Sequence, residues 1–313
     1  MGEFMKVRWR YWSGCVFAGV LSMALAAAAS AQVVVTVDGD TAYATISLTD
    51  NNGVTYDADV TIVFDSPENL TPQGLNLTAE LVDPAAMQSR LPGGDLLPLC
   101  LPRLFCPPPT VDPAFPVMIT VEPIDFPWLF LSGFDQNETG TGDLSFKNTY
   151  QFDVHTHDLP YTEGSLYRLF KAPIGEPFTD VTTDVLQGSM RARGRGGAFS
   201  QFIVVSDPRD QTTLALAKLL LLNTRILMAV LDDGLRLDLL GLVAKVEALI
   251  IIDLTGALDA LDQLIADIEA GAGIDIANVW SADHDVTNDA GEMLSLAYTT
   301  RFSMTRNAGS ANP

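Results

Sequence analysis

Alternation of apolar and polar residues predicts that residues 32–82 form β-strands. In Val33–Val37, Ala42–Leu48 and Ala58–Phe64, β-branched and aromatic residues alternate with small or polar ones. The stretches between them, Asp38-Gly39-Asp40 and Asn51-Asn52-Gly53, contain the residues that hairpin turns require. This pattern is typical of an antiparallel sheet with one buried face.

Short strands separated by turns are expected to continue to residue 206. A proline-rich excursion at residues 83–127 interrupts them. Strand-like runs then return at 128–132, 144–156, 165–171, 178–185, 189–195 and 199–205. Because no helical pattern lies between these runs, residues 32–206 are predicted to form an all-β sandwich and not a parallel α/β sheet.

The pattern changes to a helical period after the sandwich. Apolar residues recur at intervals of three and four from Gln211 to Asp232 and again from Leu235 to Ala270. With Asp232-Asp233-Gly234 as the turn, residues 207–272 are predicted to form a hairpin of two long antiparallel helices. The first helix is apolar on more than one side, so we expect the sandwich or another subunit to cover it.

The end of the chain allows two interpretations. Residues 273–306 return to a strand-like pattern that ends in Ala297–Met304, which predicts a closing β-segment that re-enters the sheet. The alternative is a third helix over Asn288–Ala297, where apolar residues also fit helical spacing. Residues 307–313 are expected to be disordered. The predicted fold class is mostly β: an antiparallel sandwich, two long antiparallel helices and a closing β-segment.

Residues 1–31 have the pattern of a secretory signal peptide. A basic start is followed by the uncharged apolar stretch Cys15–Ala29, and Ala29-Ser30-Ala31 before Gln32 is a small-x-small cleavage pattern. The apolar stretch is shorter than the roughly 20 residues that span a bilayer, which disfavours an uncleaved anchor. We therefore expect cleavage between Ala31 and Gln32 and a periplasmic or secreted protein, typical of a Gram-negative bacterium.

Charge excludes several classes of partner. The chain carries 39 acidic and 18 basic residues, a net charge of −21, and removal of residues 1–31 makes it −23. Such a chain repels phosphate backbones and anionic lipid surfaces, so we expect no nucleic-acid partner and no stable membrane insertion after processing. The one basic run, Arg191–Arg195, is expected to neutralise the protein's own acidic strands.

Two cysteines remain after residue 31, Cys100 and Cys106, separated by five residues within the proline-rich excursion. In an oxidising compartment, two such neighbours are predicted to form a local disulfide. A metal site would need further cysteine or histidine ligands nearby in the sequence, and none is present there.

The densest group of metal-ligand residue types is Asp153–Asp158. Because alternate residues of a strand share a face, His155 and His157 are expected to lie beside Asp153, an arrangement that can begin a metal site. His284 is a candidate third ligand. The favoured interpretation, however, is a polar outer face whose apolar neighbours point to the core.

A second candidate site resembles the opening of a calcium loop. Its oxygen ligands would be Asp135, Asn137 and Thr139, followed by Gly140, with Asp143 at the ninth position. The twelfth position is Phe146 instead of glutamate, so a polar β-turn is favoured. We therefore expect no cofactor, with Ca²⁺ or another divalent cation as the alternative.

No catalytic motif is evident: the chain has no Gly-x-Ser-x-Gly, Walker, His-Glu-x-x-His or dinucleotide pattern. A hydrolase that uses two carboxylates stays open as the least favoured alternative. The prediction is a non-enzymatic structural, binding or assembly module that acts through an unknown protein partner or self-association. The main alternative is a divalent-cation-dependent binder of carbohydrate or of a cell surface.

Several stretches resemble an uncharacterised family of secreted proteobacterial proteins, in which a β-sandwich precedes a helical pair and a last strand. They are Gly188–Gly197 with Phe199–Val205, Leu166–Lys171 with Phe178–Val181, and Arg301-Phe302-Ser303. The resemblance covers residues 145–206 and 288–304, and it is looser to the sandwich modules of ankyrins and netrin receptors. It implies a fold and a location, and transfers no catalytic residue.

Overall fold

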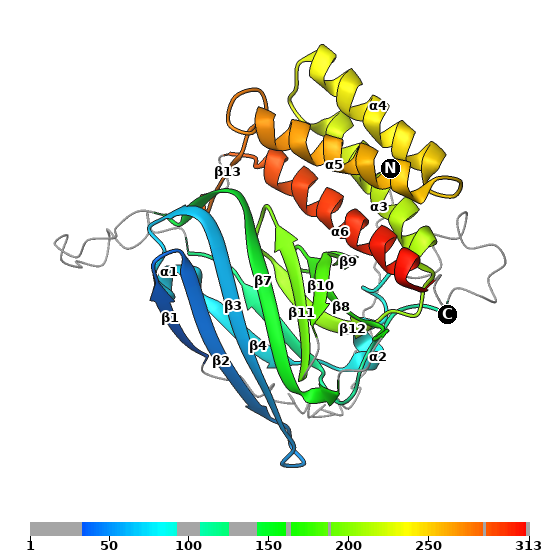
Figure 1. Cartoon of the computed structure of the whole chain (residues 1–313). Coiled ribbons are helices and arrows are strands. Elements are labelled where there is room, and N and C mark those ends of the chain that lie inside the picture. Colours follow the sequence, from blue (N-terminus) through cyan, green and yellow to red (C-terminus); the bar gives the residue numbers. More distant parts are fainter. Residues whose placement is uncertain are drawn as a thin grey trace, which may run out of the picture.

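A computed structural model describes residues 33–92, 107–124, 143–160, 164–186, 189–283 and 286–310. In these residues two antiparallel sheets pack as a sandwich, and a group of packed helices and one short strand follow (Figure 1). The predicted architecture of a sandwich followed by helices is confirmed. The number of helices and the nature of the last segment differ from the prediction.

The first sheet contains the longest strands. Its order is β1-β2-β3-β7-β11-β10, with every neighbouring pair antiparallel. The strands are β1 Val34–Asp38, β2 Thr41–Thr49, β3 Thr55–Glu68, β7 Ser145–Pro160, β11 Ser189–Gly196 and β10 Thr182–Leu186. Along β2 the buried residues Ala42, Ala44, Ile46 and Leu48 alternate with exposed or half-buried ones, as the sequence pattern predicts.

The second sheet closes the other side of the core. Its order is β4-β6-β12-β8-β9, and β5 also pairs with β12. The strands are β4 Leu77–Leu81, β5 Thr110–Val111, β6 Val117–Val121, β8 Tyr167–Ala172, β9 Thr179–Asp180 and β12 Gln201–Ser206, and the short helices α1 Pro72–Leu75 and α2 Pro84–Met87 flank β4. Phe152 of β7 stacks on Phe202 of β12 with ring centroids 3.9 Å apart, which joins the two sheets.

The C-terminal part holds the helices α3 Gln211–Met228, α4 Asp233–Leu249, α5 Leu254–Gly271 and α6 Asp289–Ser310. An aspartate caps the start of each of the first three, because its carboxylate accepts a backbone N–H of the first turn. Asp210 accepts from Thr213 at 2.9 Å, Asp232 from Gly234 at 2.7 Å, and Asp253 from Gly256 at 3.0 Å. These helices share a second apolar core.

The predicted single helix over Leu235–Ala270 is wrong. The chain leaves the helix after Leu249 and starts again at Leu254, so α4 and α5 pack against one another as a hairpin. Asp253 causes the restart, because its backbone, at φ −150° and ψ 83°, is not helical and its side chain caps a new N-terminus. Apolar residues continue at helical spacing across the break, so periodicity did not reveal it.

The prediction for the last segment is right only at its start. A short strand, β13 Val279–Ser281, does re-enter the first sheet by pairing with β7. The expected strand over Ala297–Met304 is instead part of helix α6. The alternative prediction of a third helix over Asn288–Ala297 is therefore the right one, although the helix continues further, to Ser310. The backbone of residues 307–310 is therefore helical, where a disordered tail was expected. Buried Ala290, Met293, Leu294, Ala297 and Met304 repeat at helical spacing and face the other helices.

Helix α6 connects the helices to the sandwich. It packs against α3 and α5 on one side and against β7, β10 and β11 on the other (Figure 1). The Ser295 hydroxyl donates to the carbonyl of Arg195 at 2.6 Å, and the Thr299 hydroxyl donates to that of Thr182 at 2.8 Å. None of the helices described is both long and apolar enough to cross a membrane.

Candidate metal centre

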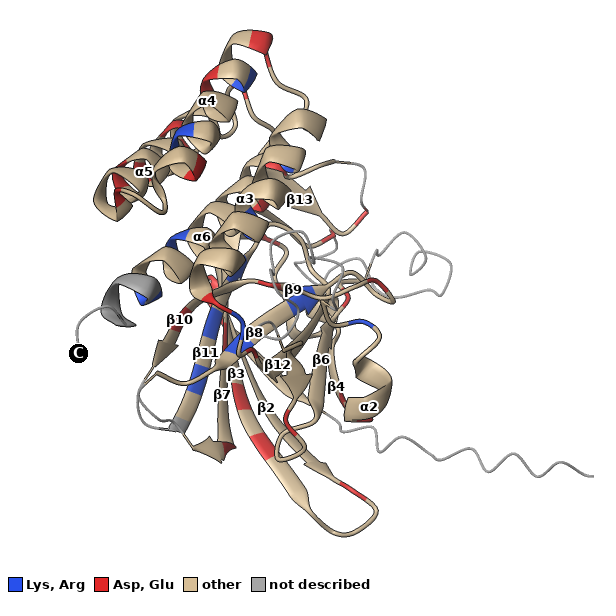
Figure 2. Cartoon of the chain, turned by 90° about the vertical axis from the view of Figure 1, so that its right-hand side faces the viewer, with Lys and Arg blue, Asp and Glu red and all other residues tan. Residues whose placement is uncertain are grey.

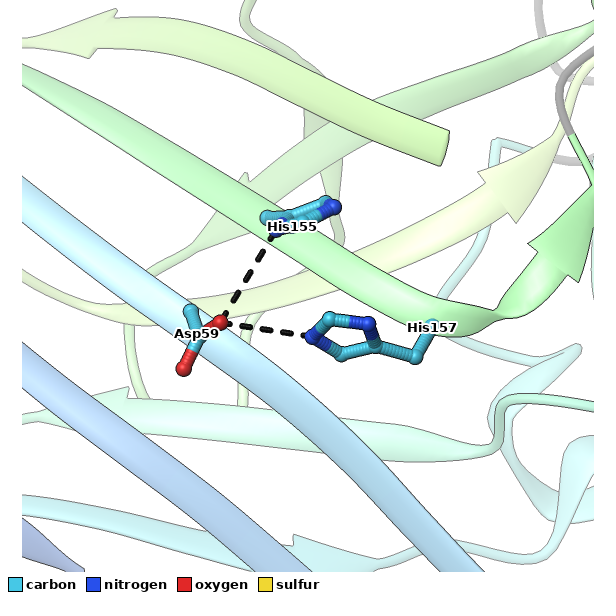
Figure 3. A group of neighbouring side chains, drawn as sticks. All are labelled: Asp59, His155 and His157. Carbon is cyan, nitrogen blue, oxygen red and sulfur yellow. Dashed lines mark hydrogen bonds and ion pairs between the residues drawn. The ribbon is translucent and has the colours of Figure 1, made fainter. Parts of the chain in front are cut away.

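Two neighbouring strands bring an aspartate and two histidines together on the outer face of the first sheet. Asp59 of β3 lies directly opposite His155 of β7, and His157 follows two residues later on the same face of β7. Their neighbours Val60, Val154 and Thr156 point inward and are buried. Figure 3 shows both imidazoles directed at the carboxylate. The alternation of the strands therefore creates the group.

The spacing of the three side chains suits a metal ion. The Oδ2 atom of Asp59 lies 3.3 Å from Nε2 of His157 and 3.8 Å from Nδ1 of His155. One ligand atom from each residue lies within 4.8 Å of the other two. Two ligands held about 2.1 Å from a tetrahedral ion are separated by about 3.4 Å. Small side-chain movements would therefore complete three corners of such a tetrahedron.

The surroundings leave the group accessible and favour the metal-binding form of one histidine. The side chains of Asp59 and His157 are each 51% exposed, and that of His155 is 19% exposed. Burial, together with Arg191 and His157, lowers the pKa of His155 below its ordinary value despite the nearby carboxylates. His155 is thus mostly neutral at pH 7, which is the form that binds metals.

Asp153 does not join the histidines as the sequence suggested. Its carboxylate accepts hydrogen bonds from Arg193 at 3.0 and 3.2 Å and forms an ion pair with Arg191 at 3.5 Å. The prediction that these arginines neutralise the protein's own acidic strands is confirmed for Asp153. Figure 2 shows the basic residues of β11 as blue bands along the strand. Asp59 is the third residue of the group instead. The only indication of this in the sequence was that Asp59 is a polar residue in a strand of alternating pattern, which places it on the outer face.

Of the other predicted site residues, the structure describes Asp143, which lies away from this group. Asp143 precedes the first residue of β7, whereas His155 lies ten residues along that strand, at about 3.3 Å per residue. The structure therefore does not bring Asp143 to the histidines. The remaining candidates lie outside the described residues: Ala31, Gln32, Cys100, Cys106, Asp135, Asn137, Thr139 and His284.

A known protein family matches the chain over both the sandwich and the helices. The model of DUF6689, a family of unknown function, matches residues 17–308. The chain belongs to this family. The match of DUF6689 covers the sandwich and the helices alike, whereas the resemblance noted from the sequence covered only residues 145–206 and 288–304. Neither the curated proteins nor the solved structures contain a match to the chain.

In this DUF6689 protein the donor set decides which ions would fit. Two imidazoles and one carboxylate suit Zn²⁺, Ni²⁺, Cu²⁺ or Fe²⁺, whereas Ca²⁺ prefers six to eight oxygen ligands. With three protein ligands, a tetrahedral ion would keep one position open to solvent. Without a metal, the same contacts act as a cross-strand pairing of a carboxylate with two imidazoles.

Proposed function

We propose that this DUF6689 protein is a non-enzymatic binding protein of the periplasm or the cell exterior that holds one divalent transition-metal ion. The ligands are Asp59, His155 and His157. The observation that carries the proposal is the convergence of their three ligand atoms within 4.8 Å. The signal-peptide pattern of residues 1–31 supports the location. An open coordination position facing solvent would allow the ion to take a ligand from a cell surface or a carbohydrate.

Zinc is the probe for this proposal. We expect purified residues 32–313 to bind one Zn²⁺ in calorimetry and to melt several degrees higher in its presence. Binding to the folded state alone at 100 times the dissociation constant adds about 2.7 kcal/mol of stability. His157→Ala removes a half-exposed ligand and should weaken binding at least about tenfold with little effect on the metal-free melting temperature.

A neighbouring carboxylate provides the matched control. Asp57 lies two residues before Asp59 on the same exposed face of β3, outside the group of three ligands. Asp59→Asn should weaken zinc binding at least about tenfold, while Asp57→Asn should leave it within about twofold. Equal losses of zinc affinity in the two variants would mean that zinc binding depends only on the negative charge of the surface. Absence of any zinc-dependent shift in the wild type would reject the proposal.

A second candidate function is protein–protein contact through the helical part. The observation that favours it is a cavity of about 500 Å³ whose lining includes the exposed apolar residues Val230, Ile274, Val279 and Val286 beside Asp275 and Asp289. Val230 and Ile274 are 86% and 80% exposed, and exposed apolar groups that lie together often mark an interface.

Self-association is the direct test of this surface. In sedimentation velocity with excess chelator, we expect the sedimentation coefficient to rise with protein concentration. Val230→Lys should abolish that rise, because it replaces an apolar group of this surface with a charge. Val54→Lys, at an exposed valine in the turn before β3, should retain it. A monomer at every concentration would exclude self-association through this surface.

A further inference from the structure

A second cavity lies between α3 and the outer face of the second sheet. It has a volume of about 320 Å³. Its walls are mostly apolar, and they come from the segment after α2, from the turn before β9 and from α3. Leu91, Phe178 and Leu214 are buried in the walls, whereas Leu220 and Leu221 are exposed at the rim. A cavity of this size and lining is in the range of small-molecule sites.

Charged side chains lie at the base of this cavity. Arg209, Lys218 and Asp180 line it, although each is less than a tenth exposed. The Lys218 ammonium lies 2.7 Å from Oδ2 of Asp180, and Arg209 donates to Asp207 from Nε at 2.8 Å and from Nη2 at 2.7 Å. These two ion pairs are neutral by themselves.

The cavity lies at the junction between α3 and the sandwich, and the buried positive and negative charges at this junction do not balance. Arg168 on β8 is fully buried and is attracted by both Asp180 and Asp207. Among the described residues this junction thus holds three buried cations and two buried carboxylates. In a protein with a net charge of −21, this local excess of positive charge would attract an anion.

Arg209 supplies a donor for such an anion. Its Nε and Nη2 atoms bind Asp207, and its Nη1 atom makes no hydrogen bond within the part of the chain that the structure describes. Guanidinium groups bind carboxylates through charge-assisted hydrogen bonds, which are stronger where water is excluded. A carboxylate at Arg209 would leave its apolar tail against the leucines and Phe178.

We infer that this cavity binds a small organic monocarboxylate with an apolar tail, its carboxylate at Arg209 and its tail between α3 and the second sheet. One excess positive charge matches one carboxylate. At about 30 Å³ per heavy atom, the cavity has room for about ten heavy atoms. Octanoate has that size, so it is the probe of choice. The inference is independent of the metal centre.

Three ligands separate the contributions of charge and tail. In calorimetry on residues 32–313 with excess chelator, we expect octanoate to bind one to one at micromolar to submillimolar concentration. Octanamide, which is neutral and nearly the same shape, should bind at least about tenfold more weakly. Acetate, which lacks the tail, should not bind at millimolar concentration. Equal affinity for octanoate and octanamide, or no octanoate binding at millimolar concentration, would overturn the inference.

Variants at the rim locate the site without disturbing the buried ion pairs. Leu221 is 43% exposed, so Leu221→Asp should fold normally and place a negative charge against the apolar tail of the bound ligand. We expect octanoate affinity to fall about tenfold in Leu221→Asp and less in the neutral, equally sized Leu221→Asn. Leu237→Asp makes the same change at a leucine of α4 that is 68% exposed and lies outside the cavity. A similar loss there, or none in Leu221→Asp, would refute the assignment.

Discussion

Replacing Lys218 by methionine is expected to lower the free energy of unfolding by about 3–5 kcal/mol, because it leaves the Asp180 carboxylate buried without its ion-pair partner. Lys218 extends from α3 into the junction with the sandwich, where its ammonium lies 2.7 Å from Asp180. It also donates to the hydroxyls of Thr299 and Ser303 on α6 at 2.8 and 2.9 Å. Urea denaturation followed by circular dichroism measures the loss.

Two comparisons test this reason for the loss. Lys245→Met, at an exposed lysine of α4, should change stability by less than about 0.5 kcal/mol. The double variant Lys218→Met/Asp180→Asn should have a free energy of unfolding at least about 1 kcal/mol higher than that of Lys218→Met alone, since no unpaired carboxylate remains. A double variant as unstable as the sum of both single changes would show that the ion pair is not the cause.

The same pair predicts a pH dependence. Burial favours a higher pKa for Asp180, but Lys218 and Arg168 outweigh it and hold that pKa below its ordinary value. A lowered folded-state pKa stabilises the protein above the unfolded-state value and ceases to do so as pH falls. The stability difference between wild type and Lys218→Met/Asp180→Asn, which lacks this carboxylate, should therefore begin to narrow below about pH 4 in urea denaturation.

The second large effect is expected at Gly291 in the first turn of α6. A Cβ atom there would overlap the carbonyl oxygen of Asn148 and lie 2.5 Å from the side-chain amide nitrogen of Asn288. That amide donates to the carbonyls of Asn148 and Gly197 at 2.7 and 2.9 Å, and so fixes α6 to the sandwich. Gly291→Ala should lower the free energy of unfolding by about 3 kcal/mol.

Gly241 in α4 provides a control with the opposite sign. A Cβ atom at Gly241 would meet nothing within 4 Å. Alanine is favoured over glycine in a helix by about 0.5–1 kcal/mol, so Gly241→Ala should stabilise the protein by that amount. Urea denaturation of both variants checks the prediction. Stabilisation by Gly291→Ala would mean that α6 does not approach the sandwich as closely as described.

Local pattern was enough to predict strands such as β2 and the start of α3 at Gln211. Burial of one face imposes a period of two on each strand separately, so Ala42–Leu48 predicts β2 without knowledge of its neighbours. Turn composition also depends only on nearby residues, so Asp232-Asp233-Gly234 indicated a turn close to the start of α4, which begins at Asp233 and not at the predicted Leu235.

Local pattern was insufficient wherever distant segments decided the outcome. The Thr- and Ser-rich stretch within Ala297–Met304 has the β-branched composition of a strand. It folds as a helix because one polar face satisfies Lys218 and the carbonyl of Thr182 while the apolar face joins the second core. Packing thus outweighed intrinsic preference in α6.

The candidate sites divide in the same way. The shared face of His155 and His157 follows from strand alternation, and the sequence predicted it. The third residue, Asp59, is 98 residues away from His157, and only the pairing of β3 with β7 places it there. The charges at the second cavity likewise come from β8, β9, the segment before α3 and α3 itself. The sequence shows which residue types are present, but whether they lie together depends on contacts between segments far apart in the chain.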